Sequence, residues 1–299
     1  MRFRDYFKAP DVSYRVWKVW MRNRDVFMKT VKVNFLLPFL EPILYLLGMG
    51  FGLGIYVREV DGMSYAAFIA PALVGISMMN ASFFECTYAS FVRMYYQKTF
   101  DAIISTPLSL DEVILGEILW GSTKSLINAS LMLPVLFALQ LIKLPDSLLL
   151  IPFSLLAGLV FSAIAMCFTA ISPTIDSFNY PTFLLITPMF LFSGTFFPLS
   201  ALPDPIRLAS QMFFPLTHVV IICRGLTTGR LDAQSLTSLA WLISAGAVLT
   251  ILSINLMRRR LLACPADSRE ALEDGRGKNI LWINPHVPPT SGGPACAII

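Results

Sequence analysis

Four ionisable side chains lie in or beside strongly apolar stretches of the sequence: Glu41, Glu85, Glu117 and Lys124. An ionisable group at membrane depth is costly and therefore points to a function. Glu117 and Lys124 are seven residues apart and share one helix face. Glu41 is the deepest acid, and we expect it to face a polar cavity or to pair with Lys124. These intramembrane polar residues either take part in transport or only hold helices together.

The most informative hydrophilic stretch is RMYYQKTFDAIISTPLSLDEVILGE, residues 93–117. Its pattern predicts a short amphipathic helix over residues 99–104, with Phe100, Ile103 and Ile104 on one face. Pro107 ends this helix, because proline disfavours helical structure in the residue before it. A short helix held between two spans at the bilayer surface is suited to docking a cytoplasmic partner. An ordinary well-capped loop is the alternative.

A second helix is predicted to begin at about Leu110. Ser109 and Glu112 have the spacing of a capping box, in which each side chain bonds the backbone N–H of the other residue. This helix leads directly into the next apolar stretch.

No set of residues has the pattern of a catalytic or metal site. The five cysteines are scattered and the two histidines, His218 and His286, are far apart. A phosphate-binding loop is absent from the sequence, since Gly275–Lys278 lacks the following Ser or Thr. We therefore expect no cofactor on this chain, no metal and no ATP hydrolysis by the chain itself.

The elements that position these residues are membrane helices. The chain has 299 residues, is 56% hydrophobic and has only 14% charged residues, against roughly 25% in soluble domains. Several apolar runs exceed the roughly 18 residues needed to cross a bilayer. The sequence therefore predicts an all-α membrane protein with six transmembrane helices. Their expected ranges are 34–56, 65–87, 116–139, 147–171, 178 to about 192, and 236–257.

Charge fixes the predicted orientation. Residues 1–32 carry nine Lys or Arg against three Asp, with Trp17, Trp20 and Met21 at helical spacing. They predict an N-terminal interfacial helix on the cytoplasmic leaflet, with a merely solvated basic arm as the alternative. The Arg258–Arg260 triplet is also expected in the cytoplasm. Both termini inside require an even number of crossings, which six spans satisfy.

The stretch SGTFFPLSALPDP, residues 193–205, breaks the fifth span. Residues 208–223 are mostly apolar. With only 16 residues and several polar side chains among them, the stretch is too short and not apolar enough for a normal span. We predict re-entrant or surface-lying outer helices before the last span. The expected domains are a basic interfacial segment (1–32), a six-span domain (33–262) and a disordered cytoplasmic tail (263–299).

Two long motifs carry a resemblance to a known family. TFDAIISTPLSLDEVILGEILW (99–120) and FLFSGTFFPLSALPDPIRLASQMFFPLTHVVIICRGL (190–226) resemble the permease subunit of type-2 ABC exporters. GFGLG (50–54), SYAAFIAP (64–71) and ILGEILWGSTK (114–124) are more similar still to the nodulation-type branch, which exports lipo-oligosaccharides. The resemblance covers residues 13–262, and the tail departs from the pattern.

The resemblance implies a permease of the bacterial inner membrane that works with a separate ABC ATPase subunit, which holds ATP and Mg²⁺. It implies a homodimer of permeases and an amphipathic glycolipid substrate in the lipid bilayer, with no nucleic-acid partner. A drug or polysaccharide exporter of the same superfamily is the alternative. Outside transport, a lipid-modifying enzyme lacks a candidate site here, and a membrane scaffold does not fit the six-span plan.

The resemblance also implies roles for particular residues. Coupling to the ATPase falls to Thr99, Phe100, Asp101, Ile104, Thr106 and Pro107 within a coupling helix at 97–107. The outer gate falls to Gly194, Phe197, Pro198, Pro203, Pro215, His218 and Arg224.

Overall fold

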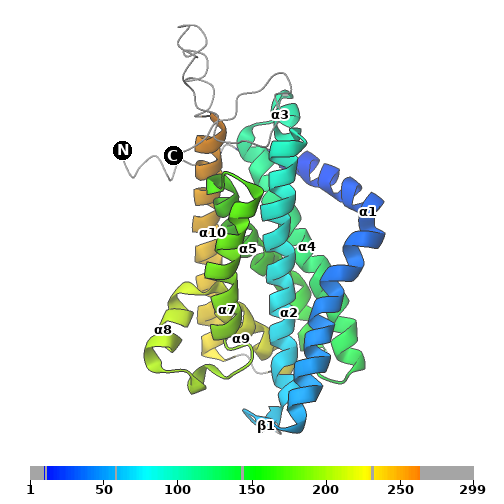
Figure 1. The fold of residues 1–299 in the computed structure, drawn as a ribbon, viewed down its shortest axis with the longest axis vertical. Helices are drawn as coiled ribbons and strands as arrows, with labels where there is room; N and C mark the ends of the chain where they lie inside the picture. The colour runs from blue at the N-terminus through cyan, green and yellow to red at the C-terminus, as the bar shows by residue number, and fades with distance from the viewer. Residues whose placement is uncertain (1–9, 11, 58, 143–144, 230–231, 263–299) are drawn as a thin grey trace.

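The computed structural model describes residues 10, 12–57, 59–142, 145–229 and 232–262, apart from the side chains at 31–39, 41 and 262. It is a bundle of helices, as predicted, with a small β-hairpin of two-residue strands in its described part (Figure 1). The helices are α1 (Val16–Tyr45), α2 (Tyr65–Phe84), α3 (Thr99–Ile104), α4 (Leu110–Ala138), α5 (Leu150–Ile171), α6 (Asn179–Pro181), α7 (Thr187–Phe192), α8 (Asp204–Phe213), α9 (Pro215–Thr228) and α10 (Ala233–Leu262). The hairpin pairs β1 (Glu59–Val60) with β2 (Met63–Ser64). The predicted tail at 263–299 lies outside the described residues.

Three helical stretches in the described part of the chain are long and apolar enough to cross a membrane: Tyr65–Tyr96, Asp146–Ile171 and Ala233–Leu261. They coincide with the predicted second, fourth and sixth spans. The bent pair α8–α9 would make a fourth if it counts as one span. The chain is thus an all-α membrane protein, and the count of six spans stays a prediction.

The predicted boundary between the basic segment and the first span is not a break in secondary structure. α1 is one helix of 30 residues that runs from the second half of the basic segment into the first half of the predicted span. No Gly or Pro occurs between Val16 and Leu37, so nothing in the sequence interrupts the helix there. Figure 1 shows the first turns of α1 inclined to the rest of the helix.

The core of the bundle is built around α5, which packs between α4 and α10, while α2 packs on α4, α5 and α9. Small residues allow α4 and α5 to approach closely. A Cβ added at Gly158 would lie 2.6 Å from Ser125 Cβ on α4. Small residues of this kind are the usual means of close helix packing in membranes.

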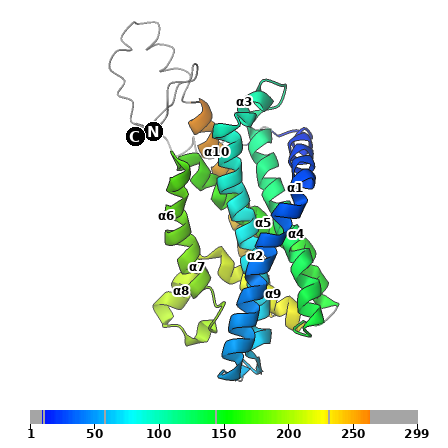
Figure 2. The ribbon, with the colours of Figure 1, turned by 45° about the vertical axis from the view of Figure 1, so that its right-hand side comes forward.

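The two ends of the bundle differ. α3 stands at one end, and β1, α8 and α9 lie toward the other (Figure 1). The short helices α6 and α7 run along one edge of the bundle, away from α1 (Figure 2). They are joined by a π-helical turn, Thr182–Ile186, and the helical structure ends at Phe192.

The two helices predicted after this break are present. α8 and α9 meet at an angle of 90°. Pro215 is the first residue of α9, where its missing N–H costs nothing. A bent pair of this kind is either a broken span or a re-entrant loop, so the re-entrant path stays a prediction.

Candidate functional site

The predicted short helix, α3, is confirmed, and it is exposed on one side only. The chain enters it through Lys98 in the left-handed conformation, with φ of 48°. Phe100 is fully buried and anchors the helix in the core, whereas Asp101 on the other face is exposed. Ile104 is 39% exposed, so the apolar face is narrower than the sequence predicts. The hydroxyl of Thr106 donates to the Ile103 carbonyl at 2.6 Å and closes the last turn.

Two exposed tyrosines precede α3 in the chain: Tyr95 and Tyr96 are 50% and 62% exposed. These tyrosines and the exposed residues Asp101, Ile104 and Pro107 are here called the docking face. The docking face is therefore the exposed side of α3 and of the residues next to it in the chain.

The predicted capping box begins α4. Ser109 Oγ accepts from the Glu112 N–H at 3.3 Å, and Glu112 accepts from the Ser109 N–H at 2.8 Å. Glu112 also accepts from the Ser13 N–H at 3.1 Å, and Arg15 donates to the Pro107 carbonyl. The chain just before α1 is therefore fastened beside the docking face.

Glu112 is kept ionised by these contacts. Burial alone would raise its pKa, but the hydrogen bonds from Ser13 and Ser109 outweigh burial and lower the pKa below its usual value.

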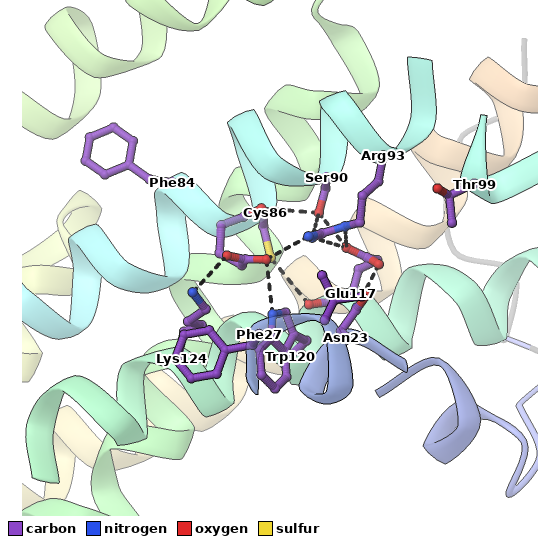
Figure 3. Close-up of polar contacts among 12 residues, drawn as sticks. Asn23, Phe27, Phe84, Cys86, Ser90, Arg93, Thr99, Glu117, Trp120 and Lys124 are labelled. Carbon is purple, nitrogen blue, oxygen red and sulfur yellow. Dashed lines mark hydrogen bonds and ion pairs between the residues drawn. The ribbon is translucent and has the colours of Figure 1, made fainter. Parts of the chain in front are cut away.

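A buried polar cluster lies between α3 and the middle of the bundle (Figure 3). It consists of Asn23, Glu85, Arg93, Glu117 and Lys124. Arg93 is its centre: Nη1 lies 2.9 Å from Glu85 Oε1, and Nη2 lies 2.5 Å from Glu117 Oε2. The sequence pattern identified both acids but not Arg93, which is eight residues after Glu85 and falls in the predicted loop.

Helices α1 and α4 complete the cluster. Asn23 Nδ2 donates to Glu117 Oε1 at 2.8 Å. Lys124 Nζ lies 3.4 Å from Glu85 Oε2 and 4.3 Å from the centre of the Phe27 ring. Lys124 therefore pairs with Glu85, whereas the expected partner Glu41 has a side chain outside the described part of the structure.

The charges of the cluster are matched two against two. Taking charges out of water costs several kcal/mol each unless they are paired and hydrogen-bonded. Glu117 meets this condition, because it also accepts from Ser90 Oγ at 2.7 Å, and Trp120 Nε1 donates to Glu85 at 3.1 Å. The geometry thus supports a cluster that joins α1, α2 and α4.

Two π-helical turns carry the α2 members of the cluster. The chain continues from α2 through Glu85–Ala89 and Val92–Tyr96, and each turn contains one of the ion-paired residues, Glu85 or Arg93. π-helical turns are rare in proteins overall, and those that occur are often found at functional sites. They connect the cluster to α3, which begins three residues later.

The last helix is fastened to the same region. Arg258 on α10 pairs with Asp111 in the first turn of α4. Arg260 donates to the Thr169 carbonyl and lies over the Phe91 ring, 5.5 Å from its centre. The arginine triplet, which in the sequence marks only orientation, therefore also makes tertiary contacts.

The predicted outer residues lie at the opposite end of the bundle. Gly194 has φ of +75°, a conformation that favours glycine, and its carbonyl accepts from Arg224 at 3.0 Å. Pro198 and Pro203 hold extended backbone around a short helical turn. Phe197 is 60% exposed.

His218 joins three helices. Its Nε2–H donates to the Gln211 carbonyl of α8 at 2.8 Å, and Nδ1 lies 3.1 Å from Ser238 Oγ of α10. The ring stacks on Trp241 with centres 4.4 Å apart. His218 thereby fixes the bend between α8 and α9.

Comparison with known proteins decides the family. The ABC-2 type transporter model matches residues 14–227, which include α3, the buried polar cluster and almost all of α9. The chain belongs to the ABC-2 type transporter family.

Several relatives within the ABC-2 type transporter family cover most of the chain. Nodulation protein J of Rhizobium leguminosarum bv. trifolii is 36% identical over 244 residues, 82% of this chain and 93% of the relative. Nodulation protein J of Sinorhizobium fredii is 34% identical over 245 residues, with the same coverage. The inner membrane transport permease YadH of Escherichia coli is 24% identical over 198 residues, 62% of this chain and 72% of the relative. The family resemblance predicted from the sequence is confirmed.

Proposed function

We propose that this chain is the permease subunit of an ATP-driven exporter in the bacterial inner membrane. It moves a lipo-oligosaccharide or a similar amphipathic glycolipid and works as a homodimer with separate ATPase subunits. The observation that carries the proposal is the docking face on α3, a short exposed helix anchored by Phe100 in a chain of the ABC-2 type transporter family.

The contacts around α3 support a route for the motion. An ATPase subunit that closes on ATP would push the docking face. Arg93 lies six residues before Thr99, and its two ion pairs connect this segment to Glu85 and Glu117. Through Asn23 the same motion would reach α1. In this proposal the displacement opens a path between the two permease copies.

The substrate class rests on similarity. The relatives that this chain matches over about nine-tenths of their length are named Nodulation protein J. The second candidate is a drug or polysaccharide exporter, which the similarity to an inner membrane transport permease supports. A transport assay separates the two. Proteoliposomes that contain the permease and its ATPase should move a labelled lipo-oligosaccharide in an ATP-dependent manner, and transport of polysaccharide or dye alone would contradict the glycolipid assignment.

Asp101→Lys tests the docking face directly. Asp101 is exposed, so the substitution should leave the fold intact. Reversing a charge at an interface is unfavourable, and we expect about a tenfold or greater loss of affinity for the ATPase subunit, or about 1.4 kcal/mol. Co-purification and ATPase activity of the complex measure this.

Glu59→Lys is the matched control, because it reverses an exposed acid on β1 at the other end of the bundle. It should leave association unchanged. Equal affinity of the Asp101→Lys variant and the native chain would remove α3 as the docking element.

A further inference from the structure

The guanidinium of Arg224, on α9, is held inside the outer end of the protein. Its Nη2 donates to two carbonyls, Gly194 at 3.0 Å and Phe68 at 3.3 Å. Its Cζ lies 3.9 Å from the centre of the Phe68 ring, which fixes the orientation of the fork.

This cation lacks a matching anion among the residues that the structure describes. The charge of Asp61, in the β1–β2 turn, acts on it, but the two do not form an ion pair. The Nε–H is buried without a hydrogen-bond acceptor. A buried charge is normally paired, because leaving it unpaired is strongly unfavourable.

Two hydroxyls in the chain segment that Arg224 contacts are unmatched as well. Ser193 Oγ and Thr195 Oγ1 flank Gly194, the residue whose carbonyl accepts from Arg224. Both side chains are fully buried, and neither hydroxyl has a hydrogen-bond partner. Most buried polar groups in native proteins have a partner, so the Nε–H of Arg224 and the hydroxyls on either side of Gly194 are exceptions that a bound ligand would explain.

We infer that Arg224, Ser193 and Thr195 form a binding site for an oxyanion carried by an amphipathic molecule, namely a phosphate, sulfate or carboxylate group. Guanidinium N–H groups match such oxygens in geometry and charge, and the two hydroxyls can donate to the remaining oxygens. An alkyl chain on this molecule would pack against Tyr65, Ile69 and Phe196, a cluster of buried apolar side chains. Within this cluster, Ile69 adjoins Phe68 and Phe196 adjoins Thr195 in the sequence. The ligand-free arrangement then leaves the three donors unmatched until the anion enters. That this molecule is the export substrate rests on the proposed function; the binding itself does not.

The test uses the full-length chain without any ATPase subunit, purified in dodecyl maltoside. Dodecyl phosphate should raise the thermal unfolding midpoint saturably, because a ligand that binds only the folded state stabilises it. Additional dodecyl maltoside, the neutral comparator, should not. Arg224→Gln should weaken dodecyl phosphate binding at least tenfold, and Arg224→Lys should keep part of it. Arg207→Gln, an exposed arginine on α8 that pairs with Asp204, is the control and should bind normally.

The source of the anion is resolved by two further arms. Inorganic phosphate alone should bind far more weakly than dodecyl phosphate, whereas phosphatidylglycerol in nanodiscs should compete with it. Equal binding of inorganic phosphate would overturn the amphipathic part of the inference. If Arg224→Gln does not fold, the Ser193→Ala/Thr195→Val double variant must still weaken binding. An undiminished shift in these variants would overturn the site and leave the ATP-driven export proposal untouched.

Discussion

Arg93 holds the buried polar cluster together through the shape of its side chain. Its planar fork reaches Glu117 with Nε and Nη2 and Glu85 with Nη1. A lysine at this position offers a point charge and cannot span both acids in this way. The side-chain exposure is 13% for Arg93 and 0% for Glu117. If Arg93 were replaced, water could therefore make few of the hydrogen bonds that Glu117 would lose.

We therefore expect Arg93→Met to lower the free energy of unfolding by about 3–5 kcal/mol, because it leaves a carboxylate buried without its cation. Denaturant unfolding of the purified chain measures this. Arg24→Met is the matched control: its pair with Asp25 has side-chain exposures of 47% and 60% and is worth only about 0–1 kcal/mol. Similar losses in both variants would show that the cluster is not a buried network.

At this scale the sequence identified Glu85, Glu117 and Lys124 because ionisable residues are conspicuous among apolar ones. It did not identify Arg93, since a basic residue in a predicted loop has the ordinary appearance of a solvated one. Asn23 and Trp120 were missed for a different reason: the partners lie 94 and 35 residues away, and a distant pairing leaves no local signal.

Among the elements, the first turn of α4 contacts both the segment before the first helix, α1, and the last helix, α10. Glu112 accepts from the Ser13 N–H before α1, and Asp111 pairs with Arg258 near the end of α10. The capping box was predictable because its residues are three apart and depend only on local geometry. The continuity of α1 was not, since charge patterning marks a change of environment and not a helix end.

The tie between Glu112 and Ser13 should depend on pH. Because the pKa of Glu112 is lowered in the folded chain, its stabilisation is complete above the unfolded pKa of about 4.3 and is lost as the pH falls through the folded value. Glu112→Gln should thus be less stable than the native chain at pH 7. The difference should shrink as the pH falls below the unfolded pKa and disappear once the pH is below the folded pKa of Glu112. Thermal unfolding across this range measures it, and a constant difference would show that the charge of Glu112 does not contribute.

For the whole molecule, the two functional regions proposed lie at opposite ends, with α3 at one and α8–α9 at the other (Figure 1). The sequence predicted this from charge and from the break at residues 193–205. It also predicted six crossings and counted residues 116–139 in α4 among them. In the described part of the chain, α4 is not one of the three stretches that are long and apolar enough to cross a membrane. α4 carries Glu117 and Lys124, which are paired inside the bundle.

Cysteine labelling tests the orientation. In a variant without the native cysteines, Ser200→Cys on the exposed turn before α8 should react with a membrane-impermeant maleimide added outside the inner membrane. Ser105→Cys, exposed after α3, should react only after permeabilisation. Labelling of position 200 from the cytoplasm alone would overturn the six-span topology.

The π-helical turns between Glu85 and Tyr96 have one more consequence. A π-helical turn accommodates an additional residue within a helix, so each of these turns absorbs in place a residue that would otherwise turn the following chain by about 100° around the helix axis. Arg93 and the docking face therefore keep their direction relative to α2, although the stretch holds more residues than a regular α-helix of the same length. Between residues 85 and 96, the additional residues are taken up by the backbone and are not passed on to α3.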